Sequence, residues 1–242
     1  MTPASRPTRL RLERYTTQRE RWPRTGRVIL AHYDAHEVVV YQAFHPATAA
    51  FAVEHQQFGG PRYSRSRMSW IKPNFLWMMF RCGWLQKDDE QGRVLAIGLD
   101  RAFFDQLLEA AVASSWDRAR YPDQPAWQRA LKRSEVRLQW DPDHGPSGAK
   151  VERRAIQLGL RGDTLARFVD EGTRWIEDIS DYVVVERSRR STPELVVPRE
   201  APYPIPSPAA AKALGVEVDD KTSIEVSPRV STQGSDGSSD PH

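Results

Sequence analysis

The sequence predicts an α+β protein with a mixed sheet core and short helices. The chain has 242 residues, of which 39% are hydrophobic and eight are Trp, which is enough apolar surface for one core. Patterns typical of strands and patterns typical of helices both occur along its central part. They follow one another without the regular alternation that predicts a doubly wound α/β sheet, so we expect the α+β class.

Composition divides the chain into four segments. Residues 1–26 show no sustained periodicity and predict a basic, flexible arm, whereas residues 27–190 have the patterning of a single globular domain. Prolines dominate residues 191–215, which predicts an extended stretch packed on the domain. The Ser-, Gly- and Asp-rich residues 216–242 predict a disordered tail.

Runs of β-branched and aromatic residues predict six strands. The clearest run has Val38, Val39 and Val40 in succession, followed by Tyr41. The expected strands are 28–33, 37–44, 93–99, 136–140, 155–160 and 182–185.

Start signals and helical spacing predict five helices. Pro46 and Pro73 stand where helices can begin, and Asp100 is a plausible N-cap. Apolar residues after Asp100 recur at helical spacing. The expected helices are 47–57, 74–82, 101–115, 127–132 and 163–171.

Several classes of protein are disfavoured. Cys82 is the single cysteine, so no intramolecular disulfide can form, and we expect a cytoplasmic protein. No apolar run approaches the roughly 18 residues of a membrane span, and no apolar stretch follows the N-terminal arginines as in a secretory signal. No metal site is expected, because a turn separates His32 from His36 and the Asp141 segment lacks the spacing of a calcium loop.

Positive charge is concentrated in the N-terminal arm. Residues 1–27 hold eight arginines against Glu13 and Glu20, whereas the central domain is nearly neutral. Such an arm could contact a nucleic-acid backbone, although many charged tails are only solvated.

The densest motif runs from Arg65 to Trp84. Arg67 and Lys72 precede the helix that is expected after Pro73. A helix N-terminus presents free N–H groups and partial positive charge, so two cations beside it suit a phosphate or pyrophosphate. The alternative is that Lys72 pairs with a surface acid and that Trp70 fills the core.

Two other segments carry polar residues at strand ends. Tyr41 and Gln42 lie next to a corner between a strand and a helix, where Gln42 could point into a pocket or face solvent. The segment from Arg154 to Asp163 includes Gln157 and leads from a strand into a helix. The N–H groups after Gly162 could hold an anion, although Asp163 competes for them.

With these motifs the chain resembles an uncharacterised, mostly microbial family known as domain of unknown function 4291. The resemblance covers roughly residues 27–215, and the Trp-Ile-Lys-Pro block that begins at Trp70 is specific to it. The family usually has Glu-Asp where Ser180-Asp181 stands here, and tends to have arginine at the position of Leu30. Other matching stretches are 40–43, 67–79, 83–84, 94–97, 136–142, 154–160, 175–176, 202–206 and 214–215.

The order of elements in this family is similar to the split, antiparallel sheet core of ADP-ribosyltransferases. The resemblance implies NAD as substrate, with Arg67 and Lys72 on the pyrophosphate. Gln42 would hold the nicotinamide ribose, and Trp70 would stack on the nicotinamide. Asp181 or Glu177 would stabilise the oxocarbenium-like transition state. The remaining expected cofactor-binding residues are Tyr41, Arg81, Arg154 and Gln157.

A second hypothesis is a non-catalytic module that binds a nucleic acid or a phosphorylated ligand. The basic arm would add salt-dependent affinity, and NAD would not be consumed. The expected basic face consists of Arg65, Arg67, Lys72, Arg81, Arg154 and Arg161.

Overall fold

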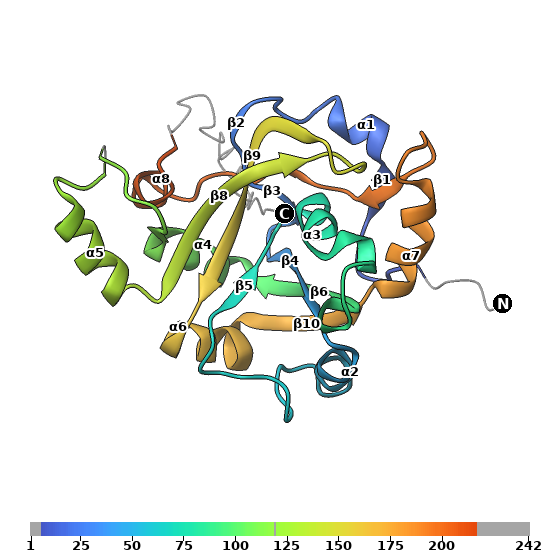
Figure 1. Ribbon diagram of the computed structural model, residues 1–242, viewed down its shortest axis with the longest axis horizontal. Coiled ribbons are helices and arrows are strands. Elements are labelled where there is room, and N and C mark those ends of the chain that lie inside the picture. The colour runs from blue at the N-terminus through green and yellow to red at the C-terminus, as the bar shows by residue number, and fades with distance from the viewer. Residues whose placement is uncertain (1–5, 119, 217–242) are drawn as a thin grey trace, which may run out of the picture.

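The computed structural model describes residues 6–118 and 120–216, and it has the predicted α+β fold. Two main sheets form its centre, and short helices surround them (Figure 1). The predicted disordered tail lies outside the described residues, except for Val216.

The first sheet has the strand order β10-β6-β4-β3-β12, and all of its neighbouring strands are antiparallel. Alternation along its central strand explains why both faces are buried: Val38 and Val40 enter one apolar cluster, and Val39 and Tyr41 enter another. The strands are β3 (Leu30–Tyr33), β4 (Glu37–Phe44), β6 (Arg93–Asp100), β10 (Thr173–Asp178) and β12 (Ala201–Pro202).

The second sheet is built on a long antiparallel hairpin of β8 and β9. Strand β5 pairs antiparallel with β9, while β2 and β7 add parallel edges. The strands are β2 (Gly26–Arg27), β5 (Ser69–Ile71), β7 (Val112–Ala113), β8 (Val136–His144) and β9 (Lys150–Leu160).

One isolated pair of backbone contacts joins the two sheets. The N–H of Tyr41 donates to the carbonyl of Lys72 at 2.7 Å, and the N–H of Lys72 donates back to Tyr41 at 3.2 Å. Because Tyr41 belongs to β4 and Lys72 directly follows β5, this pairing links the two sheets, which also share an apolar cluster that contains Val40 of β4 and Leu158 of β9.

Helices cover both faces of the first sheet. Helices α3 and α7 contribute to the cluster that contains Tyr41, whereas α2 and α4 pack on the opposite face. No helix in the described part of the chain is both long and apolar enough to span a bilayer. The helices are α1 (Tyr15–Arg19), α2 (Pro46–His55), α3 (Phe75–Cys82), α4 (Arg101–Ala110), α5 (Gln124–Arg133), α6 (Gly162–Arg167), α7 (Ser180–Arg189) and α8 (Pro208–Leu214), with helical turns at Gly83–Leu85, Asp89–Gln91 and Phe168–Gly172.

The strand predicted at 182–185 is wrong, because these residues lie in α7. Its valines suggested a strand, but the Asp178 carboxylate accepts the Ser180 N–H at 2.9 Å, which satisfies the first N–H of the helix. Tyr182 and Val183 are then buried on one face of the helix. The strand at this place in the chain is β10, which ends at Asp178.

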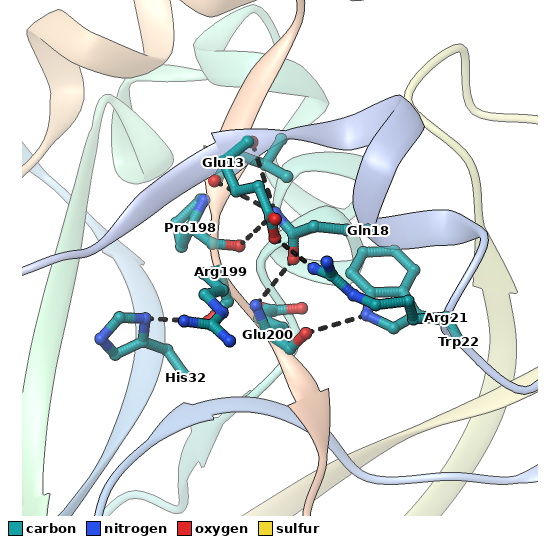
Figure 2. A network of polar contacts seen from close by, with 9 residues as sticks. Glu13, Gln18, Arg21, Trp22, His32, Pro198, Arg199 and Glu200 are labelled. Atoms are coloured by element: carbon teal, nitrogen blue, oxygen red, sulfur yellow. Dashed lines mark hydrogen bonds and ion pairs between the residues drawn. The ribbon is translucent and has the colours of Figure 1, made fainter.

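The described part of the N-terminal segment is not a free arm. Residues 12–14 form β1 (Leu12–Arg14), which pairs with β11 (Val196–Pro198). The Gln18 side chain is fully buried and donates to the carbonyls of Val197 and Pro198. Trp22 is also buried, and its indole N–H donates to the Glu200 carbonyl at 2.9 Å (Figure 2). Composition alone did not predict that Gln18 and Trp22 attach this segment to the domain, because arginines surround them in the sequence.

Glu200, in the proline-rich stretch, holds the start of α3. Its carboxylate accepts the N–H of Phe75 at 2.7 Å and the amide of Asn74 at 3.2 Å. Asn74 in turn caps the helix by accepting the N–H of Trp77 at 2.6 Å. Burial raises the pKa of the Glu200 carboxyl well above its ordinary value, against the opposing effect of the Phe75 N–H.

The Glu200 contacts predict a measurable loss of stability. Glu200→Leu leaves two buried donors, the Phe75 N–H and the Asn74 amide, without their acceptor. We expect the free energy of unfolding to fall by about 2–4 kcal/mol in a urea titration. Glu200→Gln keeps an acceptor for Phe75 and should lose clearly less. Equal losses in the two variants would contradict the role of Glu200 as a hydrogen-bond acceptor.

Candidate functional site

A cavity of about 570 Å³ lies between residues of the two sheets, next to Lys72. We call it the Lys72 cavity. Strands β4, β5, β8 and β9 each contribute to its wall, as do the loop before β5 and helix α3. It is lined by Gln42, Ala43, Phe44, Arg67, Met68, Ser69, Trp70, Lys72, Met78, Arg81, Gln91, Gln139 and Gln157.

A hollow of similar size, about 600 Å³, lies between the N-terminal segment and β9. Its wall includes Trp22, Arg24 and Arg153. The Arg153 guanidinium is already paired there with the buried Asp143 carboxylate at 2.5 Å. We treat the Lys72 cavity as the candidate site because Lys72 is a buried cation without an ion pair to a described residue.

Lys72 is the central cation of the cavity. Only 5% of the residue is exposed, and the hydrogen bond found for its ammonium group is a long one, 3.4 Å, to the carbonyl of Trp70. No carboxylate of the described residues lies within 4.0 Å of its Nζ. Burial, with a further contribution from the positive charge of Arg81, lowers the pKa of Lys72 to about 8, although Asp141 acts in the opposite direction.

Gln42 reaches the cavity from β4 and keeps one polar atom without a partner. Its amide donates to the hydroxyl of Ser69 at 2.8 Å and to the carbonyl of Trp70 at 3.1 Å. Its Oε1 is buried and accepts no hydrogen bond from the described residues. Buried acceptors are normally satisfied, so an unpaired Oε1 beside the cavity is an exception.

The opposite wall has Gln139 of β8 and Gln157 of β9, which share a hydrogen-bond network with Asp141, a residue that does not itself line the cavity. The Gln157 amide donates to Gln139 Oε1 at 2.8 Å and to Asp141 Oδ2 at 2.7 Å. Asp141 was not predicted as a site residue, because Asp141-Pro142 looked like a turn. Strand β8 instead continues to His144, which places Asp141 on the same strand face as Gln139.

The remaining cations and the aromatic wall come from β5, its preceding loop and α3. Arg67 and Arg81 line the cavity, and neither forms an ion pair within 4.0 Å with a described residue. The ring of Trp70 lies against Gly159 of β9, where an added Cβ would be 3.0 Å from two ring atoms. Gly159 therefore leaves the space in which the Trp70 ring sits.

The comparison with known proteins identifies the family. The model of a family described as a domain of unknown function (DUF4291) matches residues 28–203. The chain belongs to the DUF4291 family. This confirms the resemblance drawn from the sequence motifs, and every residue that lines the Lys72 cavity falls within the matched stretch. A search of curated proteins found no match to the chain.

Most of the site residues predicted for this DUF4291 protein converge, but the two acids do not. Gln42, Trp70, Arg67, Lys72, Arg81 and Gln157 all line the cavity. The Glu177 carboxylate instead accepts the N–H groups of Thr8 and Arg9, and Asp181 lies 3.6 Å from Arg93. Neither acid lines the cavity.

Tyr41 and Arg154 also point elsewhere. The Tyr41 ring packs edge-on against Phe75 in the cluster on the far face of β4, and only its backbone touches Lys72. Arg154 lines a hollow of about 220 Å³ together with Arg27 and Arg120. Side chains alternate along a strand, so the side chains of Arg154 and Gln157, three residues apart, project to opposite faces of β9.

The predicted use of free helix N-termini for anion binding is wrong. Glu200 and Asn74 already occupy the start of α3. At α6, the Glu135 carboxylate accepts the N–H groups of Asp163 and Thr164. The Arg161 guanidinium donates to backbone carbonyls rather than to a cavity. The cationic character of the site therefore comes from side chains. Within the described residues, no group of three His, Cys, Asp or Glu side chains is placed to hold a metal ion.

The buried amine predicts an unusual dependence of stability on pH. The folded protein releases the Lys72 proton near pH 8, but the unfolded chain holds it to about pH 10.5. The unfolded state binds more protons in this window, so stability rises with pH. We expect the free energy of unfolding to increase by about 2 kcal/mol between about pH 7.5 and 9.5 in urea titrations.

Lys72→Met keeps much of the side-chain volume without the charge, and should remove this increase. Lys132→Met at an exposed position on α5 should retain it. Parallel stability curves for the wild type and Lys72→Met would contradict the proton release assigned to Lys72.

Proposed function

We propose that the Lys72 cavity binds the phosphates of a nucleotide, and that the nucleotide is NAD. The observation that carries the proposal is the convergence of Arg67, Lys72 and Arg81 on one cavity, without a carboxylate partner for any of them. A buried ammonium without a counter-ion is costly, and a bound anion removes that cost. Arginine and lysine are the residues that most often hold phosphate oxygens.

The rest of the cavity suits the sugar and the base. Its volume of about 570 Å³ is within the usual range for small-molecule sites. The free Oε1 of Gln42 can accept a ribose hydroxyl, and the Gln139 and Gln157 amides add further polar groups on the opposite wall. Trp70 and Phe44 provide aromatic surface for a nicotinamide or adenine ring.

NAD is preferred to other nucleotides because two antiparallel units part at the cavity, as in the split core of ADP-ribosyltransferases. This is an analogy of fold and supports the reaction class only to that extent. The proposed reaction is transfer of the ADP-ribosyl group to a nucleic acid or a protein. The roles proposed from the sequence for Asp181 and Glu177 are not supported by their positions outside the cavity.

The positions of Asp181 and Glu177 favour a second candidate, a module that binds a phosphorylated ligand or nucleic acid without turnover. Glu177 holds the described start of the chain through Thr8, and the Arg9 guanidinium lies 5.5 Å from the centre of the Trp175 ring. The arm's arginines would then add a salt-dependent basic surface next to the domain. Release of nicotinamide from NAD separates the two candidates.

Two arginines of one loop allow a matched test of phosphate binding. Arg67 lines the cavity, whereas Arg65 is held at the surface by two hydrogen bonds of 2.8 Å to Asp170. Arg67→Ala should weaken NAD binding about tenfold or more by calorimetry, because a charge-assisted hydrogen bond contributes about 1.5–3 kcal/mol.

Arg65→Ala removes the same charge two residues away and should change the dissociation constant of NAD by less than about threefold. Nicotinamide riboside, which lacks the pyrophosphate, should bind more weakly than NAD and should not distinguish wild type from Arg67→Ala. Equal effects of the two arginine variants, or no binding of NAD, would refute the proposal.

A further inference from the structure

We infer that Lys72 is a nucleophile, which attacks C1′ of the nicotinamide ribose and forms a covalent bond to the ADP-ribosyl group. The inference rests on the proposed function, since it takes NAD as the ligand. It goes further, because it assigns the chemistry to an amine rather than to the acids that the fold analogy implied.

The backbone fixes the position of the Lys72 amine. Trp70 is paired with Gly159 in the second sheet, and Lys72 is paired with Tyr41 in the first. Pro73 follows directly and restricts the backbone further. The amine therefore reaches the cavity from a segment held on both sides, which favours attack from a defined direction.

The amine is also free of the contacts that usually neutralise a buried lysine. Its hydrogen bond to the Trp70 carbonyl is long, at 3.4 Å, and no described carboxylate lies within 4.0 Å. The charged and titratable groups that act on it are Arg81, Asp141 and Cys82. Asp141 is itself bound by the Gln157 amide.

An amine attacks only in its neutral form. In the protein without ligand, a pKa of about 8 leaves roughly a tenth of the Lys72 side chains neutral at pH 7, far more than for an exposed lysine. Burial and a neighbouring cation are the two recognised means of activating a lysine nucleophile, and Lys72 has both.

The composition of the cavity wall also favours Lys72 as the nucleophile. Its described lining contains cations, amides, a hydroxyl and apolar groups but no carboxylate. Without an acid against the ribose, an oxocarbenium-like centre would form beside cations. Bond formation by Lys72 lets the departing nicotinamide be replaced directly and limits the build-up of positive charge on C1′.

The proposed step joins Nζ to C1′ and releases neutral nicotinamide. The Nζ lone pair forms a bond to C1′ while the bond from C1′ to the pyridinium nitrogen breaks, and its electron pair leaves on neutral nicotinamide. Nζ then loses a proton to water, which gives an N-ribosyl lysine. Opening of the ribose ring breaks the bond from C1′ to O4′, and the proton on nitrogen moves to O4′. The product is an imine that cyanoborohydride can reduce at C1′ to a stable secondary amine.

Reductive trapping tests the inference directly. The full-length protein is first titrated with NAD by calorimetry and then incubated with NAD, with and without sodium cyanoborohydride, which reduces imines but spares the nicotinamide ring. Nicotinamide is measured in solution, and the protein is measured by intact mass and peptide mapping. We expect one ADP-ribosyl group per chain after reduction, located on Lys72 and released together with one nicotinamide. The rate of adduct formation should rise with pH and level off above the pKa that Lys72 has in the NAD complex.

Variants provide the controls. Lys72→Arg keeps a cation in the cavity but provides no nucleophile of comparable strength, and should bind NAD while forming no adduct. Lys132→Arg changes an exposed lysine in the same way and should be trapped as the wild type is. Mapping of the wild-type adduct does not depend on how well the Lys72 variant folds.

The outcomes distinguish a failure of the role of Lys72 from a failure of NAD binding. Binding of NAD without a reducible adduct, or an adduct mapped only to other lysines, overturns the role of Lys72 and leaves the nucleotide site standing. Nicotinamide release that is unchanged in Lys72→Arg overturns it as well. Failure to bind NAD at all overturns the proposed function and the inference that rests on it.

Discussion

The backbone pairing of Tyr41 with Lys72 is the contact on which the arrangement of the molecule depends. It is the point where the first sheet, through β4, meets the second, through the residue that follows β5. An opening next to this pairing, lined by residues of both sheets, is the Lys72 cavity. The same pairing directs a lysine side chain into that opening, so the joint between the sheets also places the main cation of the site.

The partners of the charged groups indicate what the Lys72 cavity binds. Elsewhere in the described chain, buried or helix-terminal charge is matched: Glu200 accepts the first N–H of α3, Glu135 serves α6, and Arg153 pairs with Asp143. The cations of the Lys72 cavity are not matched in this way. Because Lys72 is buried and has no such partner, an anionic ligand is the simplest complement to its charge.

The sequence predicted the α+β class, the strand that became β4 and the group around Arg67 and Lys72, because these depend on local patterns. It could not predict the structure of 182–185, where the hydrogen bond from the Ser180 N–H to Asp178 and the packing of Tyr182 against α3 outweighed the strand propensity of a run of valines. Nor could it predict the occupation of helix N-termini, since the acids that fill them are distant in sequence. Asp141 was missed because its proline neighbour suggested a turn, although its spacing from Gln139 fits one strand face.

The most direct measurement of the central claim is a titration of the Lys72 side chain by NMR, with ¹³C-labelled lysine and Lys72→Arg for assignment. The titration would be run with and without inorganic pyrophosphate. The account predicts a pKa of about 8 in the free protein, and a higher pKa once pyrophosphate is bound, because the anion stabilises the ammonium form. A pKa near the ordinary value of 10.5 that pyrophosphate does not move would contradict it.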